Sequence, residues 1–305
     1  MLRYILGMII GSLILTSCSQ EKVNIDSAQD GTQKIGVLLV SHGSHSAAWR
    51  KMLFAVEDSV KSEIMKNKSV QDIRSAYMEY NEPSIATRMK EFDEEGYTDV
   101  VIVPLFLTVS AHSFDDIPTI VGLKSSQSEI EKLKQERIEV YKSKANIKIT
   151  PLLDFTEILG KNLANRVKQL SENPAEEGCI LVAYGDEEYN KEWTALMNKM
   201  ASVIEVETGI NEFSHSWCGH IVHYETEPTT SAINSVLDKK KNAIVMPVLV
   251  AIDEMFQGQI IGDAIDKTNK KSRIKYKPDS ILPDKNLEQW VIEITNSYVN
   301  DIAKK

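Results

Sequence analysis

The chain has 305 residues, of which 42% are hydrophobic, so it is long enough for one large or two ordinary domains with normal cores. Its 35 Lys and Arg residues are outnumbered by 44 Asp and Glu, which gives a formal net charge of −9. An acidic chain of this kind is a poor candidate for binding nucleic acid, so we expect no nucleic-acid partner.

The N terminus predicts export and lipidation. Arg3 gives a short positive start, and the apolar run at 4–15 is too short to span a membrane comfortably. It ends in Leu15-Thr16-Ser17-Cys18, which matches the bacterial lipobox, whose cysteine is lipidated and becomes the new amino terminus. We expect a signal peptide at 1–17 and a lipid anchor at Cys18 that holds the protein in the cell envelope, on a bacterial membrane outside the cytoplasm. The alternative is an uncleaved signal anchor.

A polar stretch rich in Ser, Asp, Gln and Gly follows, and we interpret residues 18–33 as a tether. Beyond it, β-branched apolar runs alternate with segments of helical periodicity, which is typical of a parallel sheet flanked by helices. We expect, in chain order, a strand at 35–41, a helix at 47–66, a strand at 73–78, a helix at 84–95, a strand at 99–107, a largely helical segment at 115–141, a strand at 147–152 and a helix at 155–170.

The same alternation then starts again. We expect a strand at 179–183, a helix at 193–207, a strand within 213–224, a helix at 230–237, a strand at 243–250, a helix near 260 and a helix at 287–302. The second half of the chain thus has the element order of the first.

Three sequence landmarks recur at nearly constant spacing: His42-Gly43 and Tyr184-Gly185 (offset 142), Glu82-Pro83 and Glu227-Pro228 (145), and Pro104 and Pro247 (143). We therefore predict two similar α/β domains, at 34–172 and 178–305, each with a parallel sheet flanked by helices. The linker falls at 173–177, and we expect a ligand cleft between the domains.

Two cysteines remain besides Cys18. Outside the cytoplasm, Cys179 and Cys218 could form a disulfide. Cys179 lies inside an apolar, strand-like run, which is equally consistent with a buried free thiol.

Polar side chains follow the strands of the first half. His42 ends the first strand, Glu79 follows the second, and His112 lies in the segment after the third. In open α/β sheets, ligands bind at the carboxyl ends of parallel strands, so these side chains can converge on one site. Imidazoles suit ions such as Co²⁺, Fe²⁺ or Ni²⁺, and a histidine can also accept a proton near neutral pH.

The motifs around these residues resemble those of a known family. They are His42-Gly43-Ser44, then Met78-Glu79 with Glu82-Pro83-Ser84, and then Pro104-Leu105-Phe106-Leu107 leading to His112 and Asp116-Ile117-Pro118. Together they resemble the class II tetrapyrrole chelatases, and most closely the sirohydrochlorin cobalt/iron chelatases. The resemblance covers residues 34–305 in a duplicated form and is strongest over 35–120.

This resemblance implies ATP-independent insertion of a divalent metal, Co²⁺ or Fe²⁺ or else Ni²⁺, into a metal-free tetrapyrrole bound between the two domains. The metal is then a substrate, and no tightly bound cofactor is expected. His42 and His112 match the family's metal-site histidines, and Glu79 matches their acidic partner. We therefore take these three residues as both catalytic and metal-binding.

The sequence also departs from this pattern. His45 stands where the family commonly has an arginine, which could alter recognition of substrate carboxylates or add a metal ligand. In the second copy, Tyr184 replaces His42 and Met255 replaces His112, and Tyr224 takes the place of Glu79. We expect the second copy to form the other wall of the cleft.

Several nearby residues have simpler structural interpretations. Asp115 and Asp116 are expected to cap the helix that follows them, and Glu82 to belong to the turn before its proline. His220 and His223, in the same segment as His215, would point to opposite faces of a strand, so we interpret the pair as structural.

Because tetrapyrrole synthesis is normally cytoplasmic, the lipobox raises two alternatives. One is a lipid-anchored protein that binds a metal, haem or corrinoid for uptake. The other is an enzyme that removes the metal from a scavenged tetrapyrrole.

Overall fold

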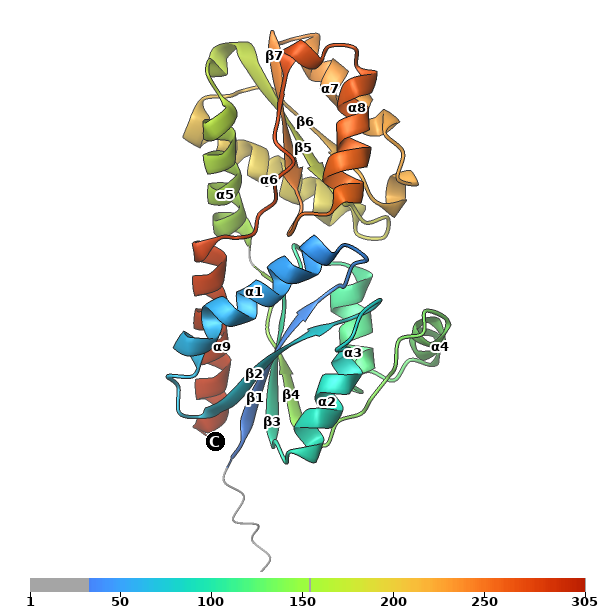
Figure 1. The fold of residues 1–305 in the computed structure, drawn as a ribbon, viewed down its shortest axis with the longest axis vertical. Coiled ribbons are helices and arrows are strands. Elements are labelled where there is room, and N and C mark those ends of the chain that lie inside the picture. Colours follow the sequence, from blue (N-terminus) through green and yellow to red (C-terminus); the bar gives the residue numbers. More distant parts are fainter. Residues whose placement is uncertain (1–32, 154, 305) are drawn as a thin grey trace, which may run out of the picture. The chain divides into compact units, whose positions relative to one another are not determined.

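Two four-stranded parallel sheets form the framework of the protein, one from each half of the chain (Figure 1). The computed structural model describes residues 33–153 and 155–304. The predicted signal peptide (1–17), the lipidated Cys18 and all but the last residue of the predicted tether (18–33) lie outside the described residues.

No helix in the described part of the chain is both long and apolar enough to cross a membrane.

The elements of the first half follow the expected alternation. They are β1 (Ile35–Ser41), α1 (Ala47–Ile64), β2 (Val70–Tyr77), α2 (Ile85–Glu94), β3 (Asp99–Pro104), the π-helix η1 (His112–Asp116), α3 (Ile117–Ile120), α4 (Gln127–Gln135), β4 (Asn146–Ile149) and α5 (Phe155–Leu170).

The second half repeats this order. Its elements are η2 (Pro174–Glu176), β5 (Glu177–Ala183), α6 (Asn190–Thr208), β6 (Phe213–Trp217), η3 (His220–Val222), α7 (Glu227–Leu237), β7 (Asn242–Val248), the π-helix η4 (Glu254–Ile261), α8 (Gly262–Lys267), η5 (Lys271–Arg273), β8 (Ile274–Tyr276) and α9 (Lys285–Ala303).

One expected helical segment is interrupted in the structure. The segment 115–141, predicted to be largely helical, breaks into η1, α3 and α4, with irregular chain after each of the last two. Gly122, with φ at +76°, follows α3 in a left-handed conformation that other residues rarely adopt. The short edge strand β8 was not predicted, because three half-buried residues carry too little pattern to stand out.

The strand order confirms that the halves are repeats. The sheets run β2-β1-β3-β4 and β6-β5-β7-β8, and all pairs are parallel. Val40 lies opposite Pro104 in the first sheet and Val182 lies opposite Pro247 in the second, so the recurring prolines occupy the same place. The central strands are almost entirely buried, which explains their continuous apolar sequence.

The two halves exchange their last helices. α5 packs against α6 and β7 of the second sheet, and Arg166 on α5 donates to the Pro247 carbonyl (3.0 Å). α9 instead packs against α1 and β3 of the first sheet (Figure 1), where Gln33 donates to the Ile302 carbonyl (3.3 Å). A division between 34–172 and 178–305 therefore separates the two sheets but not the helices that cover them.

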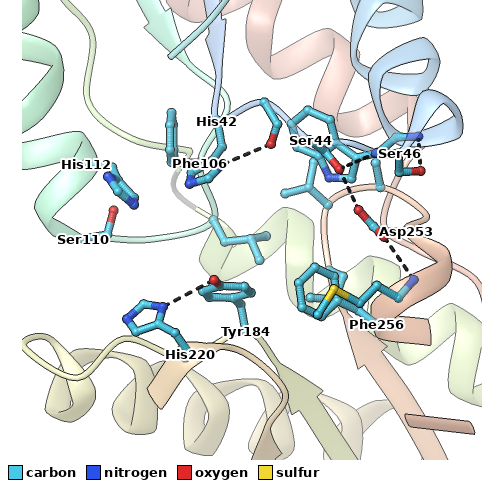
Figure 2. Close-up of a pocket in the computed structure, with 18 of the residues that line it drawn as sticks. His42, Ser44, Ser46, Phe106, Ser110, His112, Tyr184, His220, Asp253 and Phe256 are labelled. Carbon is cyan, nitrogen blue, oxygen red and sulfur yellow. Dashed lines mark hydrogen bonds between the residues drawn. The ribbon is translucent and has the colours of Figure 1, made fainter. Parts of the chain in front are cut away.

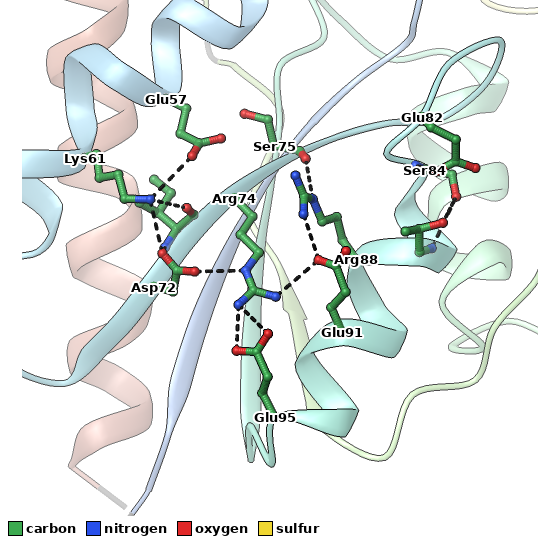
Figure 3. Close-up of polar contacts among 12 residues, drawn as sticks. Glu57, Lys61, Asp72, Arg74, Ser75, Glu82, Ser84, Arg88, Glu91 and Glu95 are labelled. Atoms are coloured by element: carbon green, nitrogen blue, oxygen red, sulfur yellow. Dashed lines mark hydrogen bonds and ion pairs between the residues drawn. The ribbon is translucent and has the colours of Figure 1, made fainter.

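A charged cluster ties the edge strand β2 to helix α2 (Figure 3). Arg74 on β2 pairs with Asp72 (2.9 Å), Glu91 (3.3 Å) and Glu95 (2.7 Å), and its guanidinium lies 4.6 Å from the centroid of the Phe92 ring. Burial raises the pKa of Asp72, but hydrogen bonds from Arg74 and Lys61 outweigh it and leave that pKa below its usual value. The carboxylate is therefore held in its charged form.

We predict that Arg74→Met lowers the free energy of unfolding by about 1–3 kcal/mol at pH 7, because it leaves three carboxylates without their shared cation. The depressed pKa of Asp72 stabilises the fold above the pKa of the unfolded chain, so this part of the loss should shrink below about pH 4. Urea denaturation measures both effects. Lys66→Met, which breaks the exposed Lys66–Glu63 pair, is the control and should cost less than about 1 kcal/mol; equal losses would contradict the prediction.

Candidate functional site

The structure brings His42, Glu79 and His112 together at the carboxyl ends of β1, β2 and β3. One potential ligand atom from each residue lies within 4.8 Å of the others. His42 Nε2 is 2.8 Å from Glu79 Oε1, and the rings of His42 and His112 lie at 74° with centroids 4.8 Å apart. The three side chains are thus close enough to share one metal ion, and the assignment of these residues as its ligands stays a prediction.

Backbone geometry holds the first two residues in place. The Glu79 N–H donates to the His42 carbonyl (2.9 Å), which continues the pairing of β1 with β2 into the loops. Gly43 has φ at +105°, and a β-carbon there would overlap the Glu79 carbonyl oxygen. Only glycine fits at this position, which accounts for the His-Gly pair.

The His42 ring is oriented through both of its nitrogens. Nδ1–H donates to the Gly43 carbonyl (3.0 Å), which directs Nε2 toward Glu79. Burial lowers the pKa of His42, but the hydrogen bond and negative charge of Glu79 outweigh it and raise that pKa overall. Burial raises the pKa of Glu79, but its bond to His42 prevails and lowers it. Both shifts favour a protonated imidazole beside an ionised carboxylate, at the place where a cation would bind.

Asp116 orients His112 and was missed as a functional residue. Its buried carboxylate accepts a hydrogen bond from His112 Nδ1 (2.7 Å), and Lys132 Nζ lies 3.4 Å from its other oxygen. Burial raises the pKa of Asp116, but the bond to His112 outweighs this and lowers it. The carboxylate thus fixes the tautomer that leaves His112 Nε2 free to bind a metal, a common arrangement behind metal-binding histidines.

The prediction that Asp115 and Asp116 cap a helix is wrong for Asp116, whose side chain makes no capping bond. Asp115 instead pairs with Lys124 (2.7 Å). The four-residue spacing of His112 and Asp116 was the available signal, because it places both side chains on one face of a helical turn.

Two pockets meet at His42 and His112. The first, of about 570 Å³, is mainly apolar and is lined from both halves of the chain (Figure 2). The second, of about 620 Å³, is polar and contains carboxylates from both halves: Glu79, Glu136, Asp186, Glu187 and Glu188. His42 and His112 line both pockets, so a ligand in either one reaches the same imidazoles.

Hydrogen bonds join the two halves beside the apolar pocket. Ser44 donates to Asp253 (2.7 Å; Figure 2), and the Trp193 indole donates to the Val109 carbonyl (3.2 Å). His45, the departure noted in the sequence, lines this pocket with its ring centroid 4.8 Å from that of Tyr80. It is therefore a wall residue and does not belong to the cluster of His42, Glu79 and His112.

The second half retains the backbone hydrogen bond of the site without the histidine and glutamate side chains. Gly219 donates to the Tyr184 carbonyl (2.9 Å) exactly where Glu79 donates to His42, so Gly219, rather than Tyr224 as predicted, is the counterpart of Glu79. The offset is 219 − 79 = 140 here but 228 − 83 = 145 at the prolines, so this loop has five extra residues. Tyr224 lies within the longer loop, and its hydroxyl is 3.3 Å from that of Tyr184.

The prediction that His220 and His223 lie on a strand is also wrong. His220 begins the short helix η3, and His223 follows it with φ at +51°. His220 Nδ1 lies 3.3 Å from the Tyr184 hydroxyl (Figure 2). His215 lies on β6 near Trp217, and burial lowers its pKa.

Met255 lines the apolar pocket on η4, the π-helix that corresponds to the one beginning at His112. Its thioether is a weak ligand for a hard dication, so the second half has no counterpart of the three predicted ligands at Tyr184, Gly219 and Met255.

Cys179 and Cys218 are both free and fully buried, so they do not form a disulfide. Burial raises the pKa of the Cys179 thiol to about 12 and raises that of Cys218 further. Both thiols are therefore protonated and unreactive at neutral pH.

Comparison with known proteins shows that the chain is similar to chelatases in sequence and in fold. The CbiX family model matches residues 36–170. A sirohydrochlorin cobaltochelatase from Saccharolobus solfataricus is 26% identical over 135 residues, which are 44% of this chain and 94% of that protein. One from Methanosarcina barkeri is 30% identical over 92 residues, which are 30% of this chain and 68% of that protein.

Among solved structures, SirB from Bacillus subtilis with Fe³⁺ has a TM-score of 0.63 at 16% identity, covering 90% of this chain and 98% of that one. The sirohydrochlorin chelatase SirB from Bacillus subtilis subspecies spizizenii, in complex with cobalt, has a TM-score of 0.57 at 15% identity, with the same coverage. The two-sheet architecture is therefore that of a chelatase over both halves of the chain.

We predict that Asp116→Asn weakens Co²⁺ binding by about 10- to 100-fold, because the loss of the carboxylate charge leaves His112 a poorer and less firmly oriented ligand. Calorimetric titration of the purified protein with Co²⁺ measures this. Asp115→Asn is the matched control, since Asp115 contacts Lys124 and not a site histidine. Equal weakening in both variants would show that Asp116 does not act through His112.

Proposed function

The chain belongs to the CbiX family of metal chelatases, and from this premise we propose that it inserts a divalent metal ion into a metal-free tetrapyrrole held in the apolar pocket. The observation that carries the proposal is the position of His42, Glu79 and His112, whose ligand atoms gather where an apolar and a polar pocket meet. A flat macrocycle and a hydrated cation can therefore reach the same side chains from different directions.

The reaction divides between these side chains. The metal approaches through the polar pocket, whose carboxylates favour a cation, and takes the place of the hydrogen bond between His42 and Glu79, whose proton passes to solvent. His42 Nε2, His112 Nε2 and Glu79 then replace part of its water shell. As the metal passes to the four ring nitrogens, two pyrrole N–H protons leave the ring, and the freed imidazole and carboxylate accept them. One of these protons restores the hydrogen bond between His42 and Glu79 and the other passes to solvent, so one dication enters the ring for two protons released, without ATP.

We propose Co²⁺ or Fe²⁺ as the metal, with Ni²⁺ as a further candidate for the same ligand set. Imidazole and carboxylate ligands suit such ions without binding them irreversibly. The relatives named as cobaltochelatases and the SirB structures with Fe³⁺ and with cobalt support these choices. Sirohydrochlorin, the substrate in the relatives' name, is the reference tetrapyrrole for the assay.

The lipobox favours a second candidate reaction, removal of a metal from a scavenged tetrapyrrole at the cell surface, because the same ligand set can accept a metal from the ring. Assays started from the metallated and from the free macrocycle distinguish the two directions. A protein that only captures the macrocycle for uptake would bind it without converting the spectrum of the free macrocycle into that of the metallated one, or the reverse.

We predict that His112→Ala lowers the rate of metal insertion by at least roughly a hundredfold, because it removes a metal ligand and proton acceptor. His42→Ala and Glu79→Ala should do comparable damage, since the three residues act as one unit. Absorption spectra of sirohydrochlorin mixed with Co²⁺ or Fe²⁺ follow the reaction. The His220→Ala/His223→Ala double variant is the control and should stay within about tenfold of the wild type. A double variant that loses activity while His112→Ala keeps it would place the working site in the second half.

We also propose that the mature protein is anchored to a bacterial membrane through lipidated Cys18, outside the cytoplasm. We predict that Cys18→Ala moves the protein from the membrane to the soluble fraction without altering its fold, because stable anchoring requires the attached lipid chains. Cell fractionation and circular dichroism test the two parts of this statement. A variant that stays in the membrane fraction would contradict it.

A further inference from the structure

The described residues that line the apolar pocket carry no permanent positive charge. Among the described residues that line it, none is lysine or arginine, whereas Asp186, Asp253 and Glu254 are all acidic. A pocket that recognises a polycarboxylate is expected to present cations to it, arranged so that the charges of pocket and ligand are complementary. This pocket presents carboxylates instead.

Two neighbouring cations are already engaged. Arg50 Nη1 donates to the Ser44 carbonyl (2.7 Å), and Lys132 lies in the polar pocket with its Nζ 3.4 Å from Asp116. The basic side chains that do line the apolar pocket are histidines. Of these, His45 lies against the Tyr80 ring and His220 is hydrogen-bonded to Tyr184.

The walls suit a flat apolar ring. Both halves of the chain contribute large side chains to the pocket: Trp49, Phe106, Tyr184, Trp193, Met255 and Phe256. Met255 is 42% exposed, which is unusual for so apolar a side chain, so a bound ring would remove it from water. Burial of aromatic and thioether surface is a large favourable term for an apolar macrocycle.

We infer that this site binds a tetrapyrrole with few carboxylates, a dicarboxylate-type porphyrin, more tightly than a polycarboxylate such as sirohydrochlorin or uroporphyrin. This inference rests on the proposed function, because it specifies the substrate of the same site. Each ionised carboxylate side chain of the macrocycle that enters the pocket loses its hydration. It meets no lysine or arginine among the described lining residues, but does meet three carboxylates. A ring whose edge is mainly alkyl avoids these costs and keeps the apolar contacts.

The test compares three porphyrins that share one ring and differ in carboxylates: mesoporphyrin has the fewest, coproporphyrin has more, and uroporphyrin has the most. Trp49 and Trp193 line the pocket, so quenching of tryptophan fluorescence reports binding without turnover. At pH 8, affinity should fall along the series, by at least about tenfold from mesoporphyrin to uroporphyrin. Added salt should narrow the difference, because it screens the repulsion.

Met255→Arg tests whether the difference in affinity comes from the charge of the carboxylates or from the greater hydrophobicity of mesoporphyrin. It adds a cation to the pocket at an exposed position and should strengthen uroporphyrin binding by at least about fivefold more than Met255→Gln, which removes the thioether without adding charge. Val206→Arg is the matched control, since Val206 is 85% exposed on α6 and does not line the pocket. Val206→Arg should leave the affinities for mesoporphyrin and for uroporphyrin within about twofold of the wild type.

The results of these experiments distinguish failure of this inference from failure of the proposed function. Uroporphyrin or sirohydrochlorin that binds as tightly as mesoporphyrin overturns the inference alone, as does a Met255→Arg variant that gains nothing for uroporphyrin over Met255→Gln. If no tetrapyrrole quenches the tryptophans and none is metallated, the apolar pocket is not the substrate site, and the proposed function falls with the inference.

Discussion

Hydrogen bonding between parallel strands continues past their carboxyl ends, and the position of the site depends on this continuation. After β1 and β2 end, Met78 still donates to the Ser41 carbonyl (2.8 Å) and Glu79 to the His42 carbonyl (2.9 Å). On the other side, Leu105 donates to the Val40 carbonyl (2.7 Å). His42 and Glu79 are therefore placed by backbone bonds rather than by loose loops, while His112 is oriented by its bond to Asp116 (2.7 Å), and together a carboxylate and two imidazoles lie within reach of one ion.

Most of the fold could be predicted because its signals are local. The buried strands are continuous apolar runs, and β1 was expected with the bounds that the structure shows. The repeat of His-Gly and Tyr-Gly pairs marks two equivalent turns, since Gly43 and Gly185 both have positive φ. The convergence of His42, Glu79 and His112 followed from a general property of parallel sheets, whose carboxyl ends lie at one edge.

What could not be predicted depends on contacts between distant segments or on a change of local geometry. Asp116 was assigned to a helix cap because η1 was not recognised as a π-helix, and its role becomes visible only when its carboxylate is seen against His112. The counterpart of Glu79 was misplaced because a five-residue insertion lies between Gly219 and Pro228. The matching motifs on either side of this insertion do not show where within the loop the extra residues lie. The charge of the pocket is likewise a property of residues that meet only in the folded chain.

The crossing of α5 and α9 bears on how such a chain could arise. Both are the helix that follows the last strand of a half, and each covers the sheet of the other half. Two equal units that trade the same terminal helix have the arrangement of a domain-swapped dimer. Joining two such units through residues 173–177 would leave every contact in place and make the partnership permanent. The residues at the strand ends of one copy could then change while that copy still supplied a pocket wall and a helix, so duplication lets the two halves diverge within one polypeptide.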